Sequence, residues 1–111
     1  MTFDELVAIG LEFDGVEEST SWRTPSLKRK GKFMLRLKEE GDTAAVKLDW
    51  ENHDRLLAAH PDQIFKTSHY EGYPAFLVRL DGLSPSLARE IVELSWTDAP
   101  KAAKSLPPTS A

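Results

Sequence analysis

The chain has 111 residues, 41% hydrophobic content and a formal net charge of −4 at pH 7, which favours one globular domain with a single core. It contains no cysteine, so disulfides, thiolate nucleophiles and cysteine-ligated metal sites are excluded. No apolar run approaches the roughly 18 residues of a membrane-spanning helix, and the acidic start lacks the basic region of a secretory signal. We therefore expect a cytoplasmic protein with no membrane partner.

The chain is predicted to begin with a helix over residues 2–13. Thr2 is a good N-cap, and Glu5 three residues later completes a capping box. Two strands are predicted to follow, over residues 16–24 and 26–30. Pro25 separates them, and because proline cannot donate to a strand ladder we expect a break or bulge there.

A β-hairpin is predicted over residues 31–50, at the centre of the sheet. In its first strand Phe33, Leu35 and Leu37 alternate with side chains that are mostly cationic, and successive strand side chains point to opposite faces. One face should therefore lie on the core, and the other should present a row of cations to water. Glycine tolerates positive φ, so Gly41 suits the turn.

The second half of the chain predicts a helix, an ambiguous strand or turn, a loop, a strand and a helix. These elements are expected at residues 51–60, 62–67, 68–74, 75–80 and 85–96. Asp49 or Asn52 is the predicted cap of the first of these helices, and Ser84 that of the last. The order of elements predicts an α+β domain over residues 1–98, with one antiparallel sheet and helices packed on one of its faces. A flexible tail rich in Pro, Ala and Ser is expected over residues 99–111.

Charge is distributed unevenly along the sequence. Residues 1–18 carry six acids and no base, whereas residues 23–47 carry eight bases and three acids. A basic face can bind DNA through hydrogen bonds to phosphates and the release of counterions. The candidate phosphate-binding residues are Lys28, Lys30, Lys32, Arg36, Lys38 and Lys47. Trp22, Tyr70 and Tyr73 could add stacking against bases. The alternative interpretation is a solvated sheet face, which would carry the same residue types without binding anything.

Catalytic and metal-binding patterns are absent from the sequence. His53, His60 and His69 do not have the spacing of zinc ligands, and there is no phosphate-binding glycine motif. No serine lies in a recognisable nucleophile motif. We therefore expect no enzymatic activity, no cofactor and no metal site.

Residues 24–37, TPSLKRKGKFMLRL, resemble the central signature of MmcQ/YjbR-like proteins, in which a Pro and a Lys precede Gly-Lys and a strand. The segments DGVEE (14–18) and HYEGYPAFLVRL (69–80) and the helix ending near Trp96 also match, so the resemblance covers about residues 1–100. It implies a two-layer sandwich similar to the bacterial frataxin CyaY and to the "double wing" DNA-binding domain of the phage transcription factor MotA.

The resemblance also implies a DNA-binding protein whose partner is double-stranded DNA. It carries no catalytic residue set. Two alternatives stay open, a protein-interaction or regulatory domain without nucleic-acid binding, and a small-ligand or metal-binding domain. For the latter, frataxins are associated with iron through an acidic ridge on the first helix, but the acids here do not form a dense ridge.

Overall fold

The computed structural model describes residues 1–101, which form three α-helices, six strands and two 3₁₀ turns. The helices are α1 (Phe3–Gly10), α2 (Trp50–Ala59) and α3 (Pro85–Asp98). The strands are β1 (Val16–Ser21), β2 (Thr24–Arg29), β3 (Lys32–Leu37), β4 (Thr43–Lys47), β5 (Ile64–Phe65) and β6 (Ala75–Arg79). The 3₁₀ turns are η1 (Ser68–Tyr70) and η2 (Ala99–Lys101).

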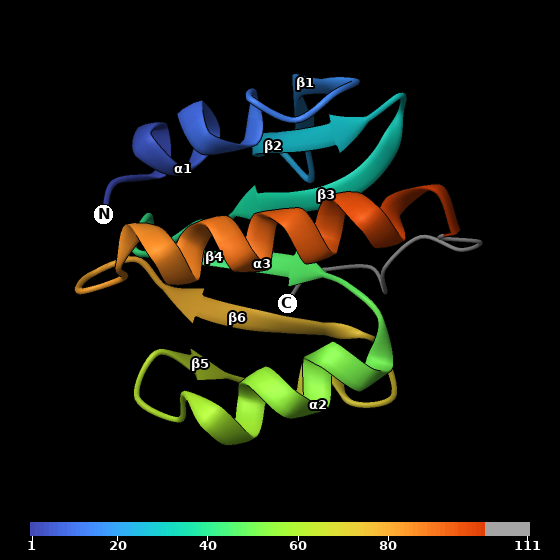
Figure 1. Cartoon of the computed structure of the whole chain (residues 1–111). Helices are drawn as coiled ribbons and strands as arrows, with labels where there is room; N and C mark the ends of the chain where they lie inside the picture. Colours follow the sequence, from blue (N-terminus) through green and yellow to red (C-terminus); the bar gives the residue numbers. More distant parts are fainter. Residues whose placement is uncertain (102–111) are drawn as a thin grey trace.

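The six strands form one antiparallel sheet in the order β1-β2-β3-β4-β6-β5. Figure 1 shows α3 lying across the middle strands, with α1 toward one edge of the sheet and α2 toward the other. The α+β prediction, a single antiparallel sheet with helices on one face, is confirmed. Among residues 1–101 no helix has the length and apolar character needed to cross a bilayer.

Local capping fixes where the helices begin, and it follows the sequence prediction. The Thr2 hydroxyl accepts a hydrogen bond from the Glu5 amide at 3.1 Å, and the Glu5 carboxylate accepts one from the Thr2 amide at 2.8 Å. Asp49 caps α2 through the Asn52 amide, and Ser84 caps α3. These bonds satisfy amide groups that no helical carbonyl can reach.

The main core lies between the helices and one face of the sheet. Each helix contributes fully or nearly buried side chains, such as Leu6 of α1, Leu56 of α2 and Ile91 of α3. They pack on apolar strand residues that the ladder places side by side, for example Val46 opposite Phe76. This burial is the main source of stability for the domain.

A β-bulge in β3 changes the predicted alternation of side chains. Leu27 of β2 pairs with Leu35, whereas the next residue, Lys28, pairs with Phe33, so Met34 is the extra residue. Met34 and Leu35 are therefore both buried in the main core, and Phe33 packs in the cluster on the opposite face. The prediction that Phe33 shares a face with Leu35 is wrong, because one inserted residue inverts the alternation beyond it.

The expected break at Pro25 is also wrong, since Pro25 lies inside β2 and pairs with Thr20 of β1. The ladder to β3 begins only at Ser26. On the β3 side, therefore, no ladder bond is lost to the proline.

The second face of the sheet is only partly open. Tyr70 of η1 is fully buried and packs in a second cluster with Ala45, Ala75 and Leu77. Trp22, Phe33 and Phe65 flank this cluster. The segment around η1 therefore covers part of the face that was expected to be wet.

The flexible tail was predicted to begin at residue 99, but the folded domain extends past this point. Ala99 is buried in the main core, and residues 99–101 form η2. The remainder of the predicted tail, residues 102–111, lies outside the described residues.

Candidate nucleic-acid interface

The six predicted phosphate-binding residues fall into two groups. Lys30 and Lys32 are exposed and Lys28 is half-buried, and all three lie on the β2–β3 hairpin. The other three are buried, with exposed fractions of 0% for Arg36, 6% for Lys38 and 8% for Lys47. The expectation of one continuous row of solvent-exposed cations is therefore wrong.

The β2–β3 hairpin presents its lysines on a tight two-residue turn. Lys30 (φ 49°) and Gly31 (φ 83°) both have positive φ, as in the type I′ turns that match strand twist. The Glu17 carboxylate accepts a hydrogen bond from the Gly31 amide at 3.1 Å. No carboxylate within residues 1–101 forms an ion pair with Lys28, Lys30 or Lys32. The three ammonium groups are thus available to an external anion.

Arg29, in the same hairpin, instead anchors it to the helix layer. Its guanidinium lies 4.1 Å from the centre of the Trp96 ring and donates to the Trp96 carbonyl at 2.9 Å. The Trp96 indole in turn donates to the Asp14 carbonyl at 2.7 Å. These contacts hold the turn end of the hairpin against the end of α3. The three lysines therefore project from a hairpin that is fixed to the helix layer.

Arg36 was predicted to face solvent but is fully buried on the second face. Its Nη1 donates to Thr24 Oγ1 at 3.1 Å and, at longer range, to the Leu37 carbonyl and Glu39 Oε2. The Trp22 ring lies over the guanidinium, with 5.3 Å between the ring centre and Cζ. A duplex backbone cannot reach a group that is covered in this way.

Lys38 and Lys47 have intramolecular partners. The Lys38 ammonium lies 3.7 Å from the Glu39 carboxylate and 5.8 Å from the Tyr70 ring centre. Lys47 donates to Asp98 Oδ2 at 2.7 Å, and both side chains are about nine-tenths buried. These two cations take part in ion pairs within the fold. The sequence pattern could not distinguish them from the exposed lysines.

The charge around Arg36 acts on Glu39. A hydrogen bond from the backbone amide of Glu39, together with the positive charges of Arg36 and Lys38, holds the pKa of the Glu39 carboxyl below its ordinary value, although partial burial opposes the shift. Glu39 therefore stays ionised at neutral pH and balances part of the charge buried beside it.

Of the three aromatic side chains considered for base stacking, Tyr70 is fully buried and Trp22 is half-buried edge-on against Phe33. Tyr73 is 40% exposed, but it lies two residues before β6. Strands β3 and β4 separate β6 from β2 in the sheet. The structure therefore does not gather these rings around the exposed lysines.

The three histidines lie in different surroundings. His53 is buried between the Trp50 and Phe76 rings, and its Nδ1 lies 2.9 Å from Asp54. His60 follows the end of α2, and His69 is exposed in η1. Within residues 1–101 no three His, Cys, Asp or Glu side chains converge as metal ligands.

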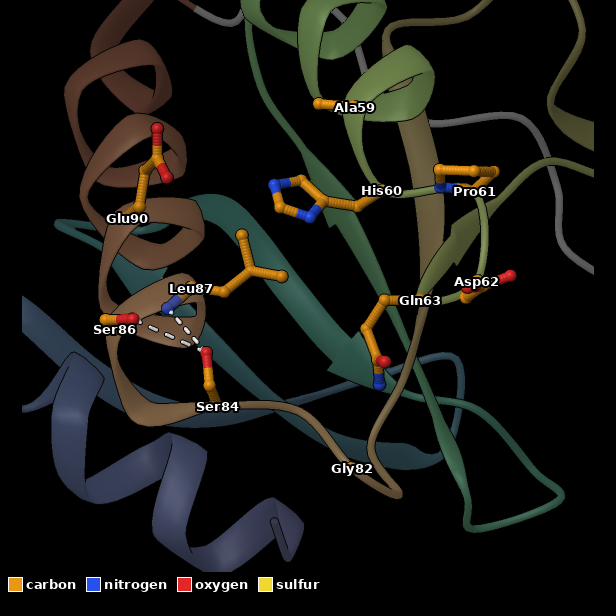
Figure 2. Close-up of a pocket in the computed structure, with 10 residues that line it drawn as sticks. All are labelled: Ala59, His60, Pro61, Asp62, Gln63, Gly82, Ser84, Ser86, Leu87 and Glu90. Carbon is orange, nitrogen blue, oxygen red and sulfur yellow. Dashed lines mark hydrogen bonds between the residues drawn. The ribbon is translucent and has the colours of Figure 1, made fainter.

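A groove of about 490 Å³ lies between the end of α2 and the start of α3. Figure 2 shows His60, Gln63 and Ser84 around it, with Glu90 higher on α3. Most of its polar groups are already bonded. Gln63 donates to two backbone carbonyls, Ser84 caps α3, and Glu90 pairs with Arg55. The groove thus offers little to bind a ligand.

Known proteins that resemble this chain in sequence or in structure were compared with it. The YjbR family model matches residues 11–97. Uncharacterized proteins of Mycobacterium bovis and of two Mycobacterium tuberculosis strains are each 33% identical to this chain over 86 residues, which cover 73% of this chain and 67% of the relative. The crystal structure of a Deinococcus radiodurans protein with a DUF419 domain matches with a TM-score of 0.75 and 22% identity, over 94% of this chain and 82% of that one. At this identity the likeness supports the fold alone.

Proposed function

The chain belongs to the YjbR family, and from this we propose that it binds DNA, with the exposed lysines of the β2–β3 hairpin contacting the phosphate backbone. The observation that carries the proposal is that Lys28, Lys30 and Lys32 share one hairpin and have no ion-pair partner among residues 1–101. The implied likeness to "double wing" DNA-binding domains supports the same assignment.

The number of lysines sets the expected strength and salt dependence. Each neutralised phosphate contributes about −0.9 to the slope of log K against log salt. Three contacts therefore give a slope of about −2.7, and affinity should fall about 40-fold between 50 and 200 mM salt. The net charge of −4 opposes binding by the rest of the surface, so the hairpin must approach the duplex first.

Charge reversal on the hairpin tests the proposal. Lys30→Glu combined with Lys32→Glu should abolish the anisotropy change of a labelled random duplex at low salt. Arg23→Glu combined with Arg79→Glu is the matched control, because both arginines are exposed and both double variants move the net charge from −4 to −8. Equal loss in the two variants would mean that net charge, and not the hairpin, governs the interaction.

Reversal of Arg36 or Lys47 would not test the proposal. Both side chains are buried with intramolecular partners, so a carboxylate at either position would damage the fold. A lost signal could then not be assigned to lost phosphate contacts.

The second candidate is a protein-interaction domain, and one observation favours it. Trp50 is 45% exposed and Tyr73 is 40% exposed, and Lys66 contacts both residues, through the Trp50 ring and the Tyr73 carbonyl. Exposed aromatic rings are enriched at protein interfaces. If this patch is the interface, Trp50→Ala with Tyr73→Ala should abolish a partner interaction that persists at high salt, while the hairpin reversal leaves it intact.

A further inference from the structure

Arg36 carries two hydrogen-bond donors that no group in the described part of the chain accepts from. Its side chain is 0% exposed, and Nη1 is held by Thr24, Leu37 and Glu39. Nε and Nη2 are buried, and neither has a hydrogen-bond partner among residues 1–101. We propose that Arg36 is the anchor of a binding site for a small organic anion, whose carboxylate or phosphate group accepts from Nε and Nη2 together.

The free donors have the geometry of a receptor. Nε–H and one Nη2–H project in parallel from the same edge of the planar guanidinium, and this fork matches two oxygens of a carboxylate or phosphate. Because Nη1 on the other edge is bonded to three acceptors, the fork is held in one orientation. Preorganisation of this kind removes much of the entropic cost of binding.

The charge balance also calls for an anion. A guanidinium stays protonated at any physiological pH, and a buried charge is costly unless it is paired. The Glu39 carboxylate lies 3.5 Å from Nη1 and is itself about half exposed. It neutralises Arg36 only in part, and an anion on the opposite edge would complete the pairing.

The side chains around the Arg36 guanidinium indicate the chemical character of the rest of the ligand. Trp22 lies over the guanidinium and is half-buried. Ala45, opposite Arg36 in the ladder, packs in one cluster with Tyr70, whose buried hydroxyl has no partner within residues 1–101 either. Apolar neighbours of this kind suit an anion with an apolar or aromatic body.

Trp22 is the side chain whose movement would most readily let such a ligand reach Arg36. It lies in the β1–β2 turn, where Trp22 (φ 52°) and Arg23 (φ 71°) both occupy the left-handed region that side chains with a Cβ disfavour. Strained turns of this type often lie beside ligand sites. Because Arg36 is fully buried and the half-buried Trp22 ring lies over its guanidinium, we infer that this ring moves aside when the anion enters.

Nuclear magnetic resonance of the arginine Nε–H groups tests the site directly. Arg36→Lys identifies the Arg36 signal by its absence. Titration of the wild-type chain with sodium phosphate and, separately, with sodium benzoate should shift the Arg36 signal, while sodium chloride at equal ionic strength should not. A shift with phosphate alone or benzoate alone assigns the anion class. No shift with either anion, or an equal shift with chloride, overturns the proposal.

Affinity measurements provide the matched control. Because lysine keeps the charge but lacks the fork, Arg36→Lys should weaken binding of the active anion about tenfold to hundredfold by calorimetry. Arg29→Lys is the control. Arg29 is half-buried, and its Nε also has no partner among residues 1–101, but it stacks on Trp96 on the helix side of the sheet. Equal weakening in both variants would contradict a specific site at Arg36. Duplex binding by Arg36→Lys should equal that of the wild type, which separates this site from the hairpin.

Discussion

The buried ion pair between Lys47 and Asp98 gives the sharpest prediction for stability. Lys47 Nζ and Asp98 Oδ2 are 2.7 Å apart, and the side chains are 10% and 13% exposed. At an effective dielectric constant of 20, the attraction between unit charges at this distance is about 6 kcal/mol before desolvation is subtracted. Asp98→Asn should therefore leave Lys47 buried with an unpaired charge.

The expected loss of unfolding free energy in Asp98→Asn is smaller than this Coulomb attraction. Removal of one partner from a buried pair costs about 3–5 kcal/mol. Part of this loss is regained, because a carboxylate at the C-terminus of α3 is unfavourable with respect to the helix dipole by about 0.5–1 kcal/mol. We expect Asp98→Asn to lower the free energy of unfolding by about 2–4.5 kcal/mol, and Tm by about 10–30 °C.

An exposed pair in the same protein is the control. Arg55 and Glu90 lie 3.0 Å apart, but their side chains are 51% and 43% exposed. Exposed pairs contribute about 0.2–1 kcal/mol, so Glu90→Gln should cost less than 1 kcal/mol in urea denaturation. Lys47→Met combined with Asp98→Leu should recover most of the loss. Equal losses for Asp98→Asn and Glu90→Gln would refute the argument from burial.

Three further perturbations have defined outcomes. Gly10→Ala should destabilise the protein by about 1 kcal/mol although alanine favours helices, because its Cβ would overlap the Cδ1 of the fully buried Leu27; a rise in Tm would contradict this. Arg23→Gly should stabilise the protein by up to about 1 kcal/mol by relieving a positive φ, and an unchanged urea midpoint would argue against strain in that turn. Glu39 has a lowered pKa in the folded state, so its contribution to stability should be lost as pH falls below about 4.5; Glu39→Gln should flatten that part of the pH–stability curve, and an unchanged curve would exclude it.

The elements and their caps could be predicted because they depend on local sequence. The capping residues Thr2, Asp49 and Ser84 act within three residues. The sequence of the central hairpin alternates with a period of two and places Gly41 in the turn. The position of these elements can therefore be predicted from the residues that form them, without knowledge of the rest of the fold.

The candidate site could be predicted only in part, because burial depends on residues distant in sequence. Arg36 is covered from one side by Trp22 of the preceding turn, and Lys47 meets Asp98, which lies 51 residues further along the chain. The bulge at Met34 leaves no distinctive residue pattern either. Alternation alone assigns all the cations to one wet face, and only the tertiary contacts separate the exposed ones from the buried ones.

The salt dependence of duplex binding tests the central claim most directly. Anisotropy titrations at several salt concentrations give the slope of log K against log salt for the wild type and for Lys30→Gln. If the hairpin lysines contact phosphates, the slope should become less steep by about 0.9 in the variant. An identical slope in both proteins, or no binding by the wild type at low salt, would contradict the assignment of the hairpin as a DNA-binding element.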